Sequence, residues 1–208
     1  MPTPDVPVWF AALLDRELVR WVLLSQLQIA QLYQHYDILL RWNRRMNLTT
    51  VKPGPETVIR HYCESLFFAA HLPAAHDKIS VLDLGSGAGF PGIPTAILMP
   101  NWQITLVESS QRKAVFLRES SRHLPNVSTR AQRMESISDQ SDWIVARAVD
   151  PSEILLNVPR IGAHVGLMIG EKDFLAIKHD SRIAWADPVR LPWGDRRLCI
   201  YGNVSRET

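Results

Sequence analysis

The sequence predicts an α/β fold, in which a helical N-terminal extension precedes a Rossmann-like, mostly parallel, seven-stranded sheet with an antiparallel last strand. From Ile79 onward, apolar strand-like runs alternate with helix-like segments, a pattern typical of parallel sheets with helices on both faces. Residues 8–47 show helical patterning without strand-like alternation. The run 81–92 leads from a strand through alternate glycines to a helix start. We therefore expect a helical extension over 1–72 and a sheet domain over 73–208.

The N-terminal part carries its own helix signals. Ser25 followed by Gln28 forms a capping-box pattern at the start of a helix. Apolar residues then recur at helical spacing, so this stripe and the neighbouring Trp42 are expected to pack in the core. The segment 52–55 contains two prolines and a glycine and breaks the chain. Its last proline suits the first turn of a further helix that runs to about His71.

The elements of the sheet domain follow in order. Strands are expected at 79–84, 103–108, 126–130, 143–147 and 163–169. Helices are expected at 92–99, 110–123, 151–160 and 173–180. The last segment differs, because the strand-like runs 182–191 and 197–203 flank Pro192-Trp193-Gly194-Asp195. This arrangement predicts a β-hairpin whose final strand is antiparallel to the rest of the sheet.

Length and composition are consistent with one enzyme domain plus a small extension, and cysteine usage makes a reducing cytoplasm the expected location. The 208 residues are 46% hydrophobic, enough to bury a sizeable core. A net charge of +2 permits nucleic-acid contact, so any RNA interface has to rest on clustered charge. Cys63 and Cys199 form neither a metal-site spacing nor a disulfide framework. The apolar residues 6–14 lack a basic lead, which predicts neither a secretory signal nor a membrane span. We expect a monomer.

The glycine-rich turn Gly85-Ser86-Gly87-Ala88-Gly89 predicts a nucleoside-cofactor site. Alternate glycines let the backbone bend sharply and approach a ligand closely. Glu108 ends the next strand, roughly 20 residues on, where an acid can accept hydrogen bonds from ribose hydroxyls. The G-x-G-x-G spacing differs from the G-x-G-x-x-G of dinucleotide sites, which favours S-adenosylmethionine over a nicotinamide. A turn that binds nothing is the plain structural alternative.

Four predicted strand ends point to the same place. In sheets of this kind ligands lie at the carboxyl ends of the strands. Gly85, Glu108, the Met134-Glu135 pair and Arg147 all fall at such ends. Their convergence is a stronger indication of a site than any one of them.

Several runs of the sequence match one family in order. Residues 41–49 read R-W-N-R-R-M-N-L-T, residues 60–66 read R-H-Y-C-E-S-L, and residues 85–94 read G-S-G-A-G-F-P-G-I-P. Further matches are Glu108-Ser109, Arg112-Lys113, Phe116-Leu117-Arg118, Arg133-Met134-Glu135, Arg147-Ala148-Val149, Leu191-Pro192 and Arg196-Arg197-Leu198. Over nearly its whole length the chain resembles the RsmG/GidB family, bacterial class I S-adenosylmethionine methyltransferases.

The chain departs from this family at two positions. Glu64 stands where the family motif carries aspartate. Ile169 precedes Gly170 where relatives commonly carry a lysine. If that lysine serves the substrate, Lys172 has to replace it.

The resemblance implies a function and a set of cofactor contacts. The family transfers a methyl group from S-adenosylmethionine to N7 of a guanine in the 530-loop region of 16S ribosomal RNA, leaving S-adenosylhomocysteine. The partner would be 16S rRNA or the small ribosomal subunit. The expected cofactor-binding residues are Gly85, Ser86, Gly87, Gly89, Phe90, Glu108, Ser109, Met134, Glu135 and Arg147.

This chemistry asks for alignment and not for a general base, because guanine N7 carries an in-plane lone pair and no proton. We expect no catalytic base and no metal. No N/D-P-P-Y/F run, which would hold an exocyclic amino group, follows the fourth strand; Arg147-Ala148-Val149-Asp150 stands there. Neither cysteine is placed like the nucleophile of cytosine-C5 methylation. Arg147 is expected to bind the donor carboxylate or an RNA phosphate, with a structural ion pair as the alternative.

Clustered basic residues support RNA binding. The expected RNA-binding residues are Arg41, Arg44, Arg45, Arg60, His61, Arg112, Lys113, Arg118, Arg196 and Arg197. The alternatives are solvated helix faces, a helix C-terminus for Arg44 and Arg45, and a structural role for His61. Asn47 is expected to fix the loop after the N-terminal helices.

Two other functions stay open on the sequence. One is a small-molecule methyltransferase that uses the N-terminal helices as a lid. The other is a catalytically silent RNA-binding or assembly module with the same fold. The salt dependence of binding distinguishes a small-molecule enzyme from an RNA-binding protein, since phosphate-dominated binding weakens steeply as salt rises. A nicotinamide-dependent dehydrogenase is a more remote alternative.

Overall fold

The computed structural model describes residues 5–46, 48, 52–73, 76–194 and 196–205. Asn47, expected to fix a loop, and Asp195, expected in the hairpin turn, lie outside the described residues.

The N-terminal part is helical throughout its described elements, as predicted. These elements are α1 (Val8–Leu18), α2 (Gln26–Met46), α3 (Pro55–Thr57), the π-helical turn η1 (Val58–Cys63) and α4 (Glu64–Ala70). The capping box of α2 is confirmed: the Ser25 N–H donates to Gln28 Oε1 at 2.9 Å, and the Gln28 N–H donates to Ser25 Oγ at 3.2 Å. Among the described residues, no helix has the length and apolar character that would carry it through a bilayer.

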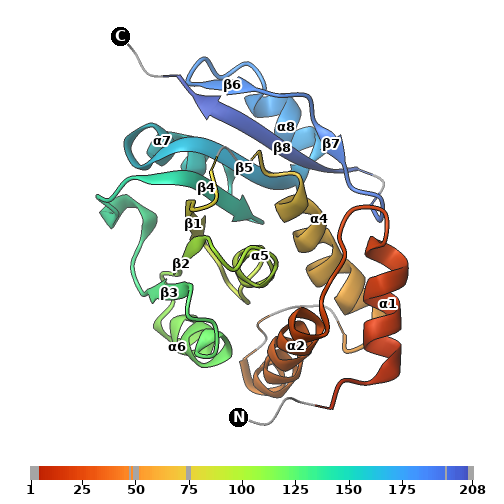
Figure 1. Cartoon of the computed structure of the whole chain (residues 1–208). Coiled ribbons are helices and arrows are strands. Elements are labelled where there is room, and N and C mark those ends of the chain that lie inside the picture. The colour runs from red at the N-terminus through yellow and green to blue at the C-terminus, as the bar shows by residue number, and fades with distance from the viewer. Residues whose placement is uncertain (1–4, 47, 49–51, 74–75, 195, 206–208) are drawn as a thin grey trace.

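The sheet has the predicted parallel topology (Figure 1). The strands are β1 (Ser80–Leu84), β2 (Gln103–Val107), β3 (Val127–Arg130), β4 (Ser141–Arg147), β5 (Gly162–Gly170), β6 (Ile183–Trp185), β7 (Val189–Arg190) and β8 (Arg197–Val204). Their order is β3-β2-β1-β4-β5-β8-β6, with β7 paired to β8 off this path. The strands from β3 to β5 are parallel, and β8 is antiparallel to β5. The chain therefore changes direction across the sheet between β1 and β4, where ligands of open α/β sheets bind.

The connecting helices lie close to their predicted positions. They are α5 (Gly92–Leu98), α6 (Gln111–Ser121), the short 3₁₀ turn η2 (Met134–Ser136), α7 (Pro151–Ile161) and α8 (Glu171–Ile177). Ser110 caps α6 through its side chain, and Asp150 caps α7 by accepting from the Ser152 N–H at 2.8 Å. Helix α8 begins two residues earlier than expected, because Glu171 and Asp173 suit the positive end of a helix.

The final hairpin contains one interruption that the sequence analysis missed. The strand expected over 182–191 is split into β6 and β7, and both pair with β8. Asp187-Pro188 lies between them. Proline has no N–H to donate to a ladder and restricts the residue before it. The main path of the sheet still contains seven strands, and β7 is an eighth, short one.

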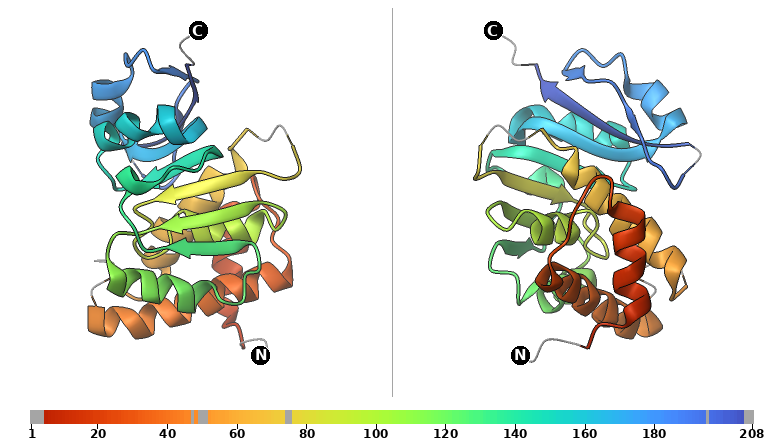
Figure 2. Two further views of the ribbon diagram at one scale, coloured as in Figure 1. Left: turned by 90° about the vertical axis from the view of Figure 1, so that its left-hand side faces the viewer. Right: turned by 45° about the vertical axis from the view of Figure 1, so that its right-hand side comes forward.

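Two apolar layers enclose the sheet. One side packs against α1, α2, α4, α5 and α6, with Phe10, Phe68 and Phe116 fully buried. The other side packs against α7 and α8. Side chains of β4 alternate between them: Trp143 and Val145 face the first layer, and Ile144 and Ala146 face the second. In the left view of Figure 2, the arrowheads of β1, β2 and β3 point to the side where α2 ends.

Candidate functional site

The glycine loop, residues 85–92, connects β1 to α5 at the carboxyl edge of the sheet. Gly85, Gly87 and Gly89 have φ angles of 69°, 56° and 88°. Gly85 also lies against its neighbour, because a Cβ built there would stand 2.6 Å from Val149 Cγ2. Both the backbone conformation and the available space therefore require glycine at position 85.

Glu108, at the end of β2, connects the glycine loop to the start of α6. Its buried carboxylate accepts from the Gly87 N–H at 3.0 Å through Oε2 and from the Ser110 N–H at 2.8 Å through Oε1. A carboxylate has about four acceptor sites, so ribose hydroxyls can donate to the sites that remain. The geometry fits the role predicted for Glu108.

A cavity of about 140 Å³, here called the loop cavity, opens beside this loop. It is lined by Gly85, Val107, Ser109, Gln132, Arg133, Met134, Glu135 and Glu153. The ends of β1 and β2 and the turn η2 form its walls, as the spacing of the sequence motifs predicts. Apolar, hydroxyl and backbone groups in one concave space suit the nucleoside end of S-adenosylmethionine. Direct contact of these residues with the donor stays a prediction.

Five residues of the predicted cofactor set line none of the cavities, namely Ser86, Gly87, Gly89, Phe90 and Glu108. Three of them pack within or against the loop. The Ser86 hydroxyl donates to the Asp83 carbonyl at 2.8 Å, and Gly89 packs against Ile93. The Phe90 ring is buried and stacks on His61, with ring centroids 4.8 Å apart. His61 thus has a structural contact, as one of its two interpretations expected.

Asp83 is a buried carboxyl group below the loop that the sequence analysis did not single out. Its Oδ2 accepts from the Gly92 N–H at 3.0 Å, whereas its buried Oδ1 has no hydrogen-bond partner. Burial raises the pKa of Asp83 from the ordinary 3.8 to about 7, and the hydrogen bond from the Gly92 N–H only partly opposes this rise. A lone acid inside the apolar run Val81-Leu82-Asp83-Leu84 was the available signal.

Replacing Asp83 with asparagine is expected to remove one pH dependence of stability. Because the folded-state pKa is raised, the unfolded chain releases this proton first, and wild-type stability falls as pH rises from about 4 to about 7. The free energy of unfolding of Asp83→Asn should therefore rise relative to wild type over this window, by at most about 1.4 kcal/mol per pH unit. Urea denaturation at pH 5 and pH 8 measures this difference.

Asp142→Asn is the matched control for that experiment. Hydrogen bonds from Ser80 lower the pKa of Asp142, so its contribution to stability is present above the ordinary 3.8 and lost only below it. This control should show no change between pH 5 and pH 8. A flat response of Asp83→Asn as well would contradict the raised pKa of Asp83.

A second cavity, of about 240 Å³, lies at the ends of β4 and β5 and is here called the arginine cavity. It is lined by Arg60, Glu64, Arg147, Ala148, Val149, Met168, Ile169, Gly170, Asp173, Leu191 and Arg197. Glu64 is 1% exposed and bridges two arginines: Oε2 pairs with Arg147 Nη2 at 3.2 Å, and Oε1 pairs with Arg197 Nη1. The structural ion pair considered for Arg147 is therefore present.

Burial and charge act in opposite directions on this cluster. Burial raises the pKa of Glu64, and the positive charges of Arg147, Arg197 and Arg60 oppose the rise. Burial lowers the pKa of Arg147, and Glu64 opposes the fall. A guanidinium stays charged despite such a shift. No role was predicted for Glu64, although a carboxylate within the run Tyr62-Cys63-Glu64-Ser65-Leu66-Phe67-Phe68 signals a buried charge.

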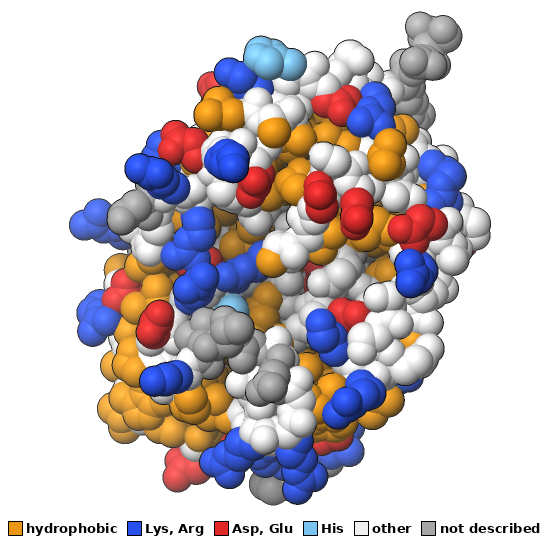
Figure 3. All heavy atoms as spheres, turned by 180° about the vertical axis from the view of Figure 1, so that it is seen from behind, with side chains coloured by type: hydrophobic (Ala, Val, Ile, Leu, Met, Phe, Trp, Pro, Cys, Tyr) orange, Lys and Arg blue, Asp and Glu red, His pale blue; other side chains and the backbone are white. Residues whose placement is uncertain are grey.

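A third concave feature, the α2–α6 groove, has a volume of about 790 Å³. It is lined by Arg41, Trp42, Arg44, Arg45, Met46, Arg112, Val115 and Glu119. Four of the arginines predicted to bind RNA thus come together. Trp42 is half-buried and packs edge-on against Phe116 of the core, with ring centroids 5.8 Å apart, while it also lines the groove. Seen from behind, Lys and Arg side chains gather in a central hollow and along the lower edge of the molecule (Figure 3).

The other predicted RNA-binding residues are divided between places. Arg60 and Arg197 line the arginine cavity. Arg118 and Arg196 are exposed and line no described cavity, and Lys113 belongs to the capped first turn of α6. The structure thus forms two basic regions, and four of the predicted residues line neither of them: Arg118, Arg196, Lys113 and His61.

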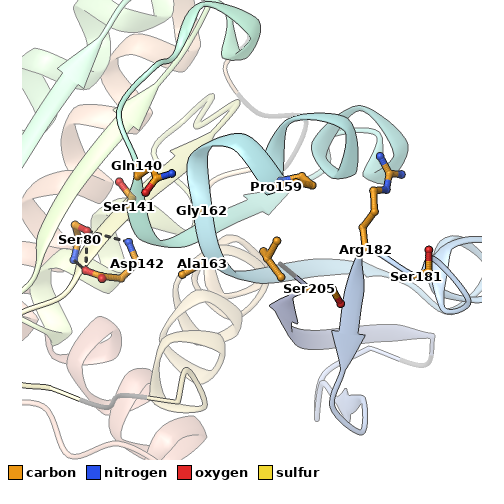
Figure 4. Close-up of a pocket in the computed structure, with 11 residues that line it drawn as sticks. Ser80, Gln140, Ser141, Asp142, Pro159, Gly162, Ala163, Ser181, Arg182 and Ser205 are labelled. Carbon is orange, nitrogen blue, oxygen red and sulfur yellow. Dashed lines mark hydrogen bonds between the residues drawn. The ribbon is translucent and has the colours of Figure 1, made fainter. Parts of the chain in front are cut away.

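A cleft of about 860 Å³ lies at the opposite, amino edge of the sheet (Figure 4). Three of its polar side chains, those of Ser80, Asp142 and Arg182, have partners. Ser80 and Asp142 point together, and the Ser80 N–H and hydroxyl each donate to Asp142 Oδ2 at 2.7 Å. Arg182 pairs with Asp180 at 2.6 Å. Because ligands of parallel sheets bind at the carboxyl edge, this larger cleft is not the candidate site.

The described residues offer few groups for other chemistry. No cluster of three or more His, Cys, Asp or Glu side chains within them is arranged to hold a metal ion. Cys63 and Cys199 are buried free thiols. Burial raises the pKa of Cys199 to about 12, which leaves almost no thiolate at neutral pH.

Comparison with known proteins gives a consistent result. Residues 28–182 match the sequence profile of GidB, described as rRNA small subunit methyltransferase G. A protein of Xanthomonas axonopodis pv. citri named Ribosomal RNA small subunit methyltransferase G is 38% identical over 187 residues, which cover 82% of this chain and 85% of that protein. The Nitrosomonas europaea protein of the same name is 36% identical over 135 residues, covering 63% of this chain but only 61% of the relative.

Solved structures support the fold. The crystal structure of a SAM-dependent methyltransferase from Aquifex aeolicus superposes with a TM-score of 0.57 at 14% identity, covering 72% of this chain and 93% of that one. Similarity at this level shows the Rossmann-like class I fold that the sequence predicted.

Proposed function

Because this chain belongs to the GidB family, described as rRNA small subunit methyltransferase G, we propose that it transfers a methyl group from S-adenosylmethionine to ribosomal RNA of the small subunit. We further propose that the acceptor is N7 of a guanine in the 530-loop region of 16S rRNA. One observation carries the proposal most: Gly85 of the glycine loop, Ser109 beside Glu108 and the Met134-Glu135 turn line one cavity, and Val149, which lies against Gly85, lines the arginine cavity.

Each part of the donor would meet a different group of the protein. Glu108 would accept hydrogen bonds from the ribose hydroxyls, and the η2 turn would meet the adenine edge with backbone groups. Arg147, whose Nη1 is buried without a hydrogen-bond partner, would bind the donor carboxylate. When bound, S-adenosylmethionine supplies an electrophilic methyl group on a sulfonium. The protein then has to align the acceptor nitrogen and exclude water.

The proposal requires no proton transfer by the protein at the acceptor. N7 of guanine carries a lone pair and no proton, so no base has to be placed beside it. Ala148 and Val149 follow Arg147 at the end of β4, where an exocyclic amino group would need acceptors. In this proposal residues 73–208 form the methyltransferase domain and residues 1–72 an RNA-facing extension of a cytoplasmic monomer.

The α2–α6 groove is proposed to bind RNA phosphates. Reversing two of its charges with Arg44→Glu and Arg45→Glu should weaken binding to small-subunit RNA and reduce the salt slope by about one for each phosphate that the variant no longer neutralises. Donor affinity should stay unchanged, because neither residue lines the loop or arginine cavities. Filter binding across a salt series, with donor calorimetry on the same samples, measures both quantities.

Lys78→Glu with Lys178→Glu is the matched control for this experiment, because it changes net charge equally. Lys78 precedes β1 and Lys178 follows α8, so both are remote from the carboxyl edge of the sheet. The control should bind RNA as wild type does. Equally weakened RNA binding in both double variants would contradict a specific groove, and donor turnover without RNA would favour a small-molecule methyltransferase.

A further inference from the structure

The arginine cavity holds more positive charge than its own acids balance. Arg60, Arg147 and Arg197 line it together with only two carboxylates, Glu64 and Asp173. We propose that this cavity is an anion subsite for a phosphate next to the acceptor guanosine, and that Glu64 is the positioning residue that holds its arginines together. This inference rests on the proposed function, since it names the part of the RNA that the same site would take.

Glu64 has the geometry of an anchor. It projects from the first turn of α4, and its two oxygens pair with arginines from the end of β4 and the start of β8. Because the Glu64 side chain is 1% exposed, turning its carboxylate away from the arginines would leave an unpaired charge in the interior. Two guanidinium groups held this close repel each other unless an anion lies between them. Glu64 therefore makes the close pair possible.

Arg197 is fixed from a second direction as well. Its Nη2 donates to the Trp193 carbonyl at 3.2 Å, and Trp193 Nε1 donates to Glu17 Oε2 of α1 at 2.8 Å. The side chain is 33% exposed and thus reaches from this support into the cavity mouth. A cation that is held before the ligand arrives loses little entropy on binding.

The charge of the donor argues that the missing anion comes from the acceptor. S-adenosylmethionine carries a sulfonium, an ammonium and one carboxylate, so it is itself a net cation. Its carboxylate can meet the free Nη1 of Arg147, which leaves Arg60 and Arg197 facing a positive ligand. A second anion removes this repulsion. Each RNA nucleotide brings one phosphate, and arginine forks bind phosphate oxygens in pairs.

The test uses the full chain saturated with S-adenosylhomocysteine, so that no methyl transfer occurs. Guanosine, 5′-guanosine monophosphate and 3′-guanosine monophosphate are titrated by calorimetry or NMR. We expect one of the two monophosphates to bind at least about tenfold more tightly than guanosine, and the tighter one identifies the side of the phosphate. Equal binding of all three would overturn the subsite.

Variants test whether the preference for a monophosphate comes from Glu64 and its arginines. Arg197→Gln should abolish the preference for the monophosphate, and Arg197→Lys should keep part of it. Glu64→Gln should also lose the preference, while Glu64→Asp, which restores the anion, should recover it. If Glu64→Gln fails to fold, Arg197→Gln still decides the question, because Arg197 is partly exposed. A preference that persists in Arg197→Gln would overturn the proposal.

The same titrations show whether the arginines bind an RNA phosphate or the carboxylate of the cofactor. S-adenosylhomocysteine affinity should change by less than about threefold in Arg197→Gln. Lost cofactor affinity with an unchanged monophosphate preference would assign the arginines to the donor and overturn the inference. Because nucleotide binding is read without turnover, a lack of RNA methylation would count against the proposed function and leave this measurement standing.

Discussion

Gly85→Val is expected to abolish binding of S-adenosylmethionine. Valine at a φ of 69° is strained, and a Cβ there would stand 2.6 Å from Val149 Cγ2. The collision pushes the loop, which lines the loop cavity, away from Val149, which lines the arginine cavity. Donor affinity measured by calorimetry should fall by at least a hundredfold, about 2.7 kcal/mol.

Gly54→Val is the control for backbone strain alone. Gly54 also has a positive φ, of 133°, but a Cβ there would meet nothing within 4 Å. This variant should lose stability while its folded form binds the donor as wild type does. Retained donor affinity in Gly85→Val, in a sample whose thermal unfolding transition shows that it is folded, would contradict the assignment of the glycine loop to the cofactor.

Glu108→Gln is expected to weaken donor binding by about ten- to a hundredfold. Each Glu108 oxygen accepts from a backbone N–H, one on Gly87 and one on Ser110. Glutamine keeps one acceptor and turns an NH₂ group toward the other N–H, so one contact becomes repulsive. A hydrogen bond to a charged group contributes about 1.5–3 kcal/mol, and the ribose also loses its charged acceptor. Calorimetric titration with S-adenosylhomocysteine measures the loss.

Glu119→Gln provides the same chemical change at an exposed position of α6. Glu119 lies in the α2–α6 groove and away from the loop cavity. Its donor affinity should equal that of wild type. If Glu108→Gln also bound the donor normally, Glu108 would be a structural residue of the β2–α6 turn and not a ribose ligand.

Much of the fold could be predicted because each element carries a local signal. Ser25 and Gln28 mark the start of α2, and Ser110 and Asp150 mark two other helix starts. The buried central strands read as continuous apolar runs, as parallel strands do. The break at Asp187-Pro188 was missed because a strand-like pattern on either side outweighed one proline.

The candidate site was predictable where a residue is placed by its position at the end of a strand. Gly85, Ser109 and the Met134-Glu135 pair do meet at one cavity. Partnerships across long sequence distances were not predictable. The contact of Glu64 with Arg147 and Arg197 depends on how α4 packs beside β4 and β8. The positions of the three residues along the sequence do not indicate it. Phe90 similarly turned inward to His61 because the helical extension supplies a partner there.

Methyl transfer to unmodified small ribosomal subunits tests the central proposal most directly. Labelled S-adenosylmethionine is incubated with the protein and the subunits, and the RNA is digested for nucleoside analysis. The proposal predicts label in 7-methylguanosine, with Ile169 tolerated in place of the usual lysine. No label in RNA, in a sample whose donor binding calorimetry has verified, would contradict it.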